Sequence, residues 1–293
     1  MPTLDVLKRS IATVEDIQSI VRTMKALAAV SIYPYERALE SLVNYGRTIE
    51  LGLQALLADR APPPQGDPVA DDSVGIVVFG SDRGLCGRFN KEIADYSLQC
   101  LQDMGVAADQ RFCLAVGARV EARLQDAGQH VQESFFVPGS VTGITSTVQA
   151  ILQQIETWQS QHKVAKVLLF HNRQQGGRRS PETTPLLPFD FTRFQSPHAP
   201  PWPSRSLPGY TQERADLFAA LVRQYLFVGV FRACASSLAS ENASRLASMQ
   251  AAERNISERL TELSRTFSQQ RQENITEELL EVVSGFMVLV DTP

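Results

Sequence analysis

The feature that most constrains the fold is the C-terminal stretch, residues 211–290. It contains no proline and only two glycines, Gly229 and Gly285. Its apolar residues recur at alternating spacings of three and four, which predicts a single very long helix. At 1.5 Å per residue such a helix would be roughly 120 Å long, several times the span of a small domain. No globular core can bury that length, so we expect the apolar stripe to need partners along it.

A second long amphipathic pattern occupies residues 3–57 and keeps the same three-four register. Pro34 interrupts it, which removes one backbone hydrogen bond at a cost of about 3 kcal/mol. Because the register continues beyond the proline, we expect a kink in this helix and not a break. The two long stripes are natural partners for each other and predict an antiparallel coiled coil.

Between the two long helices, short apolar runs alternate with helical patterns. The expected strands are 74–79, 111–116, 131–137, 164–170 and 183–189, the last at an edge because of its prolines. The expected helices are 90–104, 118–127 and 146–162. This alternation predicts an α/β fold with a doubly wound, Rossmann-like sheet. The predicted division is a first long helix (1–60), the α/β domain (70–190), a linker (191–208) and a last long helix (209–293).

The two long helices differ in length. The first long helix can pack against only about fifty-five residues of the last one, so the packed part of the last helix ends near Arg265. The remainder, residues 266–290, is called the tip below. It is strongly apolar, with Ile275, Leu279, Leu280, Val282, Val283, Phe286, Met287, Val288, Leu289 and Val290. An exposed apolar surface of that size marks an interaction site. The alternative is a tip that folds back as a helical hairpin, although nothing between Gly229 and Gly285 offers a turn.

Composition excludes several classes of function. The formal net charge is −4, so we expect no general attraction to nucleic acid. Cys86, Cys100, Cys113 and Cys234 form no CxxC pair, which predicts reduced thiols and no structural metal. No apolar run approaches the roughly eighteen residues of a membrane span. We therefore expect a soluble, untargeted chain that is at most peripherally attached to a membrane.

The glycine-punctuated turn at residues 79–90 follows a predicted strand and opens a predicted helix. Backbone donors at such a turn could hold a phosphate. Its glycines fit neither GxGxxG nor GxxxxGK[ST], so a tight structural turn that needs small residues is favoured over a nucleotide site. For Asp82 and Arg83 a local ion pair that caps the helix is favoured over acid/base chemistry. The glycines are Gly80, Gly84 and Gly87.

Other polar residues give no signature of catalysis. The four histidines stand apart, and no serine or cysteine has the surroundings of a nucleophile. The segment 173–179 could meet phosphate, but a mobile, solvated connection between strands is favoured. Asn242 on the apolar seam is more typical of a residue that sets helix register. Taken alone, Arg245, Gln272 and Thr276 would be solvated positions on the long helix.

Three blocks of sequence resemble a known family. The first block is LKRSIATVEDIQ at 7–18 with TMKALAA at 23–29, the second is SDRGLCG at 81–87, and the third is RQENITEELLEVVSG at 271–285. Together they are similar to the gamma subunit of F-type ATP synthases. Because they occur in family order at both ends and in the middle, the resemblance covers essentially the whole chain.

The resemblance implies a rotor. In that family the antiparallel coiled coil is the central shaft inside a ring of alpha and beta subunits, and the α/β domain bears on the epsilon subunit and the membrane c ring. The catalytic sites belong to the beta subunits, so the resemblance implies no catalytic residue, cofactor or metal in this chain. It places the chain peripherally on the cytoplasmic side of the plasma membrane, or on the thylakoid.

By motif match, the resemblance also assigns roles to single residues. Met24 falls at the family's coupling methionine. Arg245, Gln272 and Thr276 fall where family members contact a loop of the beta subunit. The turn glycines at 84 and 87 become structural parts of the α/β domain.

The chain also departs from the family pattern. Residues 31–35 read SIYPY, where a basic run is usual, and the tip ends in larger apolar residues than is common. Such divergence would suit an alternative, sodium-coupled ATPase, although the choice of ion resides in the c ring. Two other readings remain open from the sequence: a free-standing α/β nucleotide-binding enzyme with coiled-coil arms, which would use the turn at 80–87, and a static coiled-coil adaptor.

Overall fold

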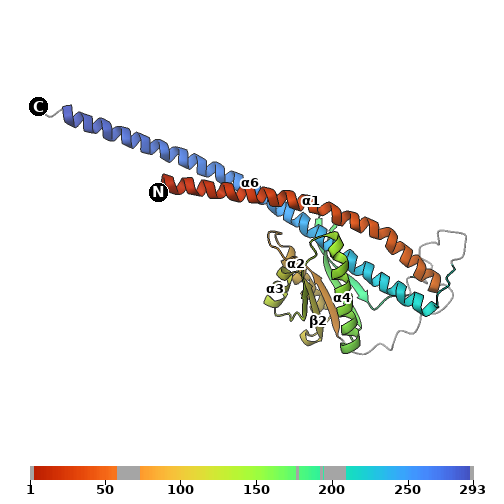
Figure 1. Cartoon of the computed structure of the whole chain (residues 1–293). Coiled ribbons are helices and arrows are strands. Elements are labelled where there is room, and N and C mark those ends of the chain that lie inside the picture. Colours follow the sequence, from red (N-terminus) through yellow and green to blue (C-terminus); the bar gives the residue numbers. More distant parts are fainter. Residues whose placement is uncertain (1–2, 58–72, 176–177, 192–193, 195–208, 291–293) are drawn as a thin grey trace. The chain divides into compact units, whose positions relative to one another are not determined.

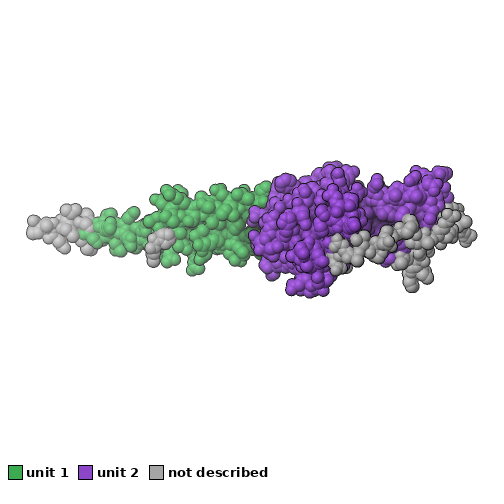
Figure 2. Space-filling model, turned by 90° about the horizontal axis from the view of Figure 1, so that it is seen from below, with its two compact units in different colours: residues 1–27, 246–293 green, residues 28–245 purple. Residues whose placement is uncertain are grey.

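The structure is a computed structural model that describes residues 3–57, 73–175, 178–191, 194 and 209–290. The chain forms two compact units (Figure 2). Unit 1 contains residues 1–27 and 246–293, and unit 2 contains residues 28–245. Most of the expected linker at 191–208, and the proline-rich boundary before the first strand, lie outside the described residues.

The two long helices are α1 (Leu4–Leu57) and α6 (Arg214–Val290) (Figure 1). Each helix has one part in unit 1 and the other part in unit 2. In unit 1, Gln18 contacts Ser257, and Lys25 pairs with Glu253 at 2.5 Å. Residue numbers rise along α1 while they fall along α6, so the pairing is antiparallel, as predicted. Among the described residues of this unit, the buried apolar ones are Leu7, Val21, Met249 and Leu263.

The same antiparallel relation holds within unit 2. The hydroxyl of Tyr45 donates a hydrogen bond of 2.9 Å to Gln224, and Arg214 donates to the carbonyl of Leu56 at 3.1 Å. α1 is a single helix through Pro34, so the surviving register correctly predicted that the proline does not break it.

Unit 2 also contains a five-stranded sheet in the order β3-β2-β1-β4-β5. The strands are β1 (Val74–Phe79), β2 (Arg111–Val116), β3 (Glu133–Phe135), β4 (Lys166–Gln175) and β5 (Arg178–Leu187). The first four are parallel, and β5 runs antiparallel beside β4 at the edge. The β-branched run of β1 is buried along its whole length, as expected for a central parallel strand.

Helices cover both faces of the sheet. α2 (Phe89–Asp103) and α3 (Ala118–Asp126) enclose one core with Ile76 and Val78 of β1. α4 (Val141–His162), together with α1 and α6, encloses the other core with Val77 and Phe79. A short 3₁₀ turn, η1 (Ala108–Gln110), precedes β2. The doubly wound α/β fold is therefore confirmed. The sheet with α2, α3 and α4 is called the sheet domain below.

Several predicted boundaries were wrong. α4 begins at Val141 and not at 146, because the Ser140 hydroxyl accepts a hydrogen bond from the amide of Gly143 and caps the helix. β3 is shorter than predicted. The segment 173–179, expected to be a mobile loop, belongs largely to the paired strands β4 and β5, with residues 176–177 outside the description. Its polar residues gain their backbone hydrogen bonds from the neighbouring strand, which the sequence pattern did not reveal.

α6 is one continuous helix. The hairpin alternative for the tip is therefore wrong. The helix also contains an 18-residue window that is apolar enough, on average, to cross a membrane by length and composition. The expectation from the sequence concerned uninterrupted apolar runs, whereas this window is apolar only on average. α6 uses its apolar character within unit 2, where Val228, Val230 and Phe231 are buried.

Candidate functional site

The first candidate site is the edge of the sheet where its parallel strands end. In doubly wound sheets, ligands bind outside the carboxyl ends of the strands where the strand order reverses. Here the order reverses between β1 and β4. α6 occupies this place: the Ser237 hydroxyl donates to the carbonyl of Phe79 at 3.4 Å, and the Ser240 hydroxyl donates to the carbonyl of Asn172 at 3.1 Å.

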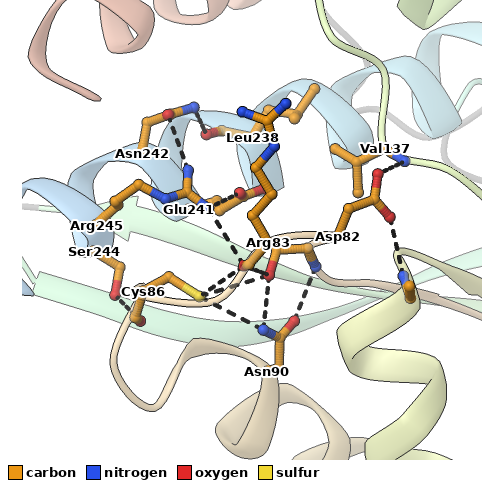
Figure 3. Close-up of polar contacts among 12 residues, drawn as sticks. Asp82, Arg83, Cys86, Asn90, Val137, Leu238, Glu241, Asn242, Ser244 and Arg245 are labelled. Atoms are coloured by element: carbon orange, nitrogen blue, oxygen red, sulfur yellow. Dashed lines mark hydrogen bonds and ion pairs between the residues drawn. The ribbon is translucent and has the colours of Figure 1, made fainter. Parts of the chain in front are cut away.

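A row of polar side chains on one side of α6 makes these contacts. We call it the polar row; its members are Ser237, Ser240, Glu241, Ser244 and Arg245. Their spacing of three and four places them on one helix face. The Ser244 hydroxyl continues the row by donating to the carbonyl of Cys86 at 2.8 Å (Figure 3). The row therefore donates hydrogen bonds to backbone carbonyls of β1, β4 and the turn after β1.

The turn after β1 is held by its own side chains. The Ser81 amide donates to the side-chain oxygen of Asn90 at 2.9 Å, and the Asn90 amide group donates to the Ser81 hydroxyl at 2.7 Å. A Cβ atom at Gly80 would lie 2.3 Å from the Cβ of Val120, so only glycine fits there. Gly87 has a φ of 61°, a conformation that favours glycine. At Gly84 a Cβ would approach only the Arg119 guanidinium, at 4.0 Å.

Asp82 does not make the ion pair expected with Arg83. One carboxylate oxygen accepts from the amide of Ala118 at 3.0 Å, and the other accepts from the amide of Val137 at 2.9 Å. Asp82 therefore caps α3 and fastens the chain after β3, in place of capping the nearby α2. A carboxylate satisfies free amides at a helix N-terminus especially well, because the helix dipole adds to the hydrogen bond.

An ion pair lies at the end of the polar row. Glu241 and Arg245 approach to 2.5 Å, with side chains only 7% and 11% exposed. The same guanidinium donates to the carbonyl of Arg83 at 3.5 Å and to the side-chain oxygen of Asn242 at 3.4 Å. Burial raises the pKa of the Glu241 carboxyl above its ordinary value, although the Arg245 charge acts in the opposite direction. Figure 3 shows these groups meeting beside the turn.

Arg179 fixes the same region from β5. Its guanidinium pairs with Glu92 of α2, donates to the Ser244 hydroxyl, and lies 5.5 Å from the centre of the Phe89 ring. Arg179 was expected in a mobile loop, so this role was not predicted from the sequence. The sequence at 178–185 shows no alternation of apolar with polar residues, so it carried no signal for this strand.

The second candidate site lies on unit 1. Met24 is half-buried on α1, whereas Gln272 and Thr276 are exposed on α6. The Thr276 hydroxyl donates to the backbone carbonyl of Gln272 at 2.8 Å, so the two residues stand one helical turn apart. Arg245, predicted to act with them, belongs to unit 2 and is largely buried.

The tip around these two residues is exposed. Every described side chain at 271–284 is exposed to solvent. The large apolar ones, between 47% and 70% exposed, are Ile275, Leu279, Leu280, Val282 and Val283. Burial on α6 ends close to the predicted limit at Arg265, since Leu263 is the last buried residue among the described side chains of the helix. The side chains at 285–290 lie outside the described residues.

A family model described as ATP synthase matches residues 3–289. The chain belongs to this family. Its relatives include an ATP synthase gamma chain of Bacteroides fragilis, 26% identical over 294 residues, which covers 98% of this chain and 100% of the relative. The gamma chain of Rhizobium johnstonii is 25% identical, covering 97% and 99%. The resemblance to the gamma subunit noted in the sequence is thus confirmed.

Solved structures with the same fold are also ATP synthase components. The central stalk and c-ring structure of Tetrahymena thermophila mitochondrial ATP synthase has a chain 22% identical, with a TM-score of 0.58 over 80% of this chain and 99% of that one. A Euglena gracilis mitochondrial ATP synthase structure contains a chain 17% identical, with a TM-score of 0.64 over 98% and 94%. These likenesses show that the fold of this chain, over 98% of its length in the second case, also occurs in ATP synthase structures.

Proposed function

We propose that this chain works as the central rotor shaft of a rotary, ion-translocating F-type ATP synthase. Its family membership over residues 3–289 supports this assignment. The antiparallel α1 and α6 are the shaft, and the sheet domain is the part that bears on the membrane rotor.

The exposed apolar tip is the observation on which the proposal depends. α6 is one helix to Val290, and its described large apolar side chains from Ile275 to Val283 are exposed. Water disfavours such a surface, so the tip requires an apolar socket supplied by other chains. A ring of alpha and beta subunits is the socket that the family provides.

The coupling of rotation to catalysis follows from the asymmetry of the shaft. One shaft inside a ring of three like pairs presents a different face to each pair, and so stabilises a different conformation and nucleotide affinity in each. Rotation then moves each pair through the three states in turn. The c ring supplies the rotation from ion flow, and the epsilon subunit accompanies the sheet domain.

Met24, Gln272 and Thr276 are proposed contacts to the beta subunit. Gln272 and Thr276 are exposed one turn apart within the apolar tip, where they can give polar specificity to an otherwise apolar contact. Arg245 belongs to the proposed set through its place in the family motif. Its guanidinium is engaged within the isolated chain, so a partner contact would require it to exchange Glu241.

The chain itself is proposed to be non-catalytic. The edge of the sheet at which a doubly wound domain would bind a nucleotide is filled by α6 through Ser237 and Ser240. Among the described residues, no group of three or more His, Cys, Asp or Glu side chains could hold a metal ion. Catalysis would therefore belong to the beta subunits, and the enzyme with coiled-coil arms is disfavoured.

The proposed location is peripheral to the membrane, on the cytoplasmic side of the plasma membrane or on a thylakoid. There the sheet domain would meet the c ring. Nucleic acid has no place in this assembly, in keeping with the net charge of −4.

Reconstitution tests the function. The chain would be co-expressed with alpha and beta subunits of its own organism, and rotation of a bead on the sheet domain would be followed in the immobilised ring. ATP-driven rotation is expected. A ring that hydrolyses ATP while the chain stays still would indicate a static adaptor, and ATP turnover by the isolated chain would indicate an enzyme.

A further inference from the structure

The polar row suggests how the sheet domain is fixed to the shaft helix. We infer that Glu241, Arg245 and Ser244 form a clamp that locks the turn at residues 81–87 to α6, so that the sheet domain and α6 turn as one body. In this clamp Glu241 is a positioning residue that holds the Arg245 guanidinium on the turn. The inference rests on the proposed rotor function.

The contacts of the clamp converge on one short piece of backbone. Arg245 donates to the carbonyl of Arg83, and Ser244 donates to the carbonyl of Cys86, three residues further along the turn. Ser244 also accepts a hydrogen bond from Arg179 of β5. Two consecutive residues of α6 thus hold the turn that joins β1 to α2, and one of them also holds the edge strand.

Because the Glu241–Arg245 pair is buried, it contributes more to the position of the turn on α6 than to the stability of the fold. Both side chains are nearly enclosed, and removing two charges from water is unfavourable, which their mutual attraction offsets only in part. One Glu241 oxygen and the Arg245 Nε have no hydrogen-bond partner within the described chain. An apolar pair could fill the same space at no greater cost, but it would not bond to a particular carbonyl.

The bonds from the Glu241–Arg245 pair to the turn are directional, and this property matters when torque acts on α6. The hydrophobic effect is itself non-directional. Hydrogen bonds require alignment of donor and acceptor. Advancing α6 by one residue would turn the polar row by about 100°, which would break its contacts to the turn, to β1 and to β4 together. The clamp therefore sets one rotational position of α6 against the sheet domain.

Other charged groups reach the pair from neighbouring elements. Asp82 of the turn raises the pKa of the Glu241 carboxyl, and Arg83 lowers it. On α1, burial raises the pKa of the Tyr35 phenol most, and the Glu241 charge raises it further. The carboxylate thus lies where α1, α6 and the turn meet within unit 2.

The test uses the complete, membrane-reconstituted ATP synthase and measures ions pumped per ATP hydrolysed. Variants Glu241→Gln, Arg245→Gln and the double variant keep side-chain size and remove charge. Each single variant is expected to lower the ratio roughly threefold or more, and the double variant no further than the worse single one, because residues in contact are non-additive. Ser244→Ala should lower the ratio in the same direction without any change of charge.

Asp95→Asn is the matched control. Lys91 and Asp95 form a pair at the same i,i+4 spacing, at 2.8 Å, but their side chains are 56% and 61% exposed. The control should retain the wild-type ratio. Loss of pumping with ATP hydrolysis retained separates slippage from simple misfolding, which would lower both.

The outcomes are distinguishable. A wild-type complex without ATP-driven pumping would remove the proposed function itself. A coupled wild-type complex in which Glu241→Gln and Ser244→Ala match Asp95→Asn would overturn the clamp alone. If Arg245→Gln uncouples while Glu241→Gln does not, Arg245 acts on a partner subunit, and the clamp is again overturned.

Discussion

The hydroxyl of Ser240 donates a hydrogen bond of 3.1 Å to the backbone carbonyl of Asn172, and both residues are almost fully buried. This contact places α6 against the carboxyl end of the sheet, where a related fold would admit a cofactor. The sheet domain is doubly wound like many nucleotide-binding domains, but α6 of the same chain takes the ligand's place. Fold alone does not determine function.

The first prediction concerns nucleotides. Because α6 fills the carboxyl edge, the isolated chain should give no heat of binding with ATP or NAD in calorimetry. The alpha/beta ring of the same synthase, titrated under the same conditions, is the positive control. Tight binding with turnover by the isolated chain would contradict the rotor assignment.

The second prediction concerns the turn after β1. Gly80→Ala should destabilise unit 2 by about 1–3 kcal/mol, the usual cost of overpacking, because the new Cβ would lie 2.3 Å from Val120. Gly139→Ala is the control, since nothing lies within 4 Å of a Cβ at that position. Urea unfolding followed by circular dichroism measures both. Equal midpoints for the two variants would contradict the close packing.

Much of the fold was predictable because the spacing of apolar residues along the chain reflects which face of each helix or strand is buried. The long stripes of α1 and α6 and the buried run of β1 have strong periods, so their type and extent were predicted correctly. The start of α4 was missed because one hydroxyl, Ser140, decides it. β5 was predicted too short because an edge strand with one half-open face has polar residues that resemble a loop.

The candidate sites were less predictable. The exposed tip followed from helix lengths alone. The polar row did not, because serines on a helix usually indicate solvated surface, and only the tertiary fold brings them to the carbonyls of β1 and β4. Asp82 was assigned to its sequence neighbour Arg83, whereas its partners, Ala118 and Val137, are distant in sequence. Such long-range pairings leave no mark in local spacing.

The third prediction concerns alkaline pH. Burial raises the pKa of the Cys113 and Cys234 thiols from 9.0 to about 12. The folded chain thus favours the protonated thiols, so their contribution to stability is complete below pH 9 and is lost as the pH rises from 9 towards 12. The urea midpoint should fall over this window. Cys234→Ala should make the fall shallower, whereas replacing the partly exposed Cys100 should not; identical slopes in both variants would count against the burial effect.

The fourth prediction concerns the polar contacts at the tip. Replacing both Gln272 and Thr276 with alanine should lower ATP synthesis while the isolated chain stays folded, because both side chains are exposed. Thr266→Ala is the control: its hydroxyl makes the same bond to the fourth preceding carbonyl, at 3.0 Å. Helix content and synthesis rate are measured for both variants. Unchanged synthesis in the double variant would remove these residues from the proposed contact.

The last prediction tests the tip itself. Truncation after Arg265 should abolish or strongly impair assembly with alpha and beta, because it removes the exposed apolar surface from Ile275 to Val283 that requires a socket. Unit 2 should remain folded, since it ends at Arg245 and makes its own core. Size-exclusion chromatography of the co-expressed subunits measures assembly, and the fluorescence of the buried Trp158 reports on the core. A truncated chain that assembles and couples normally would show that the tip has no essential socket, and the shaft proposal would lose its main support.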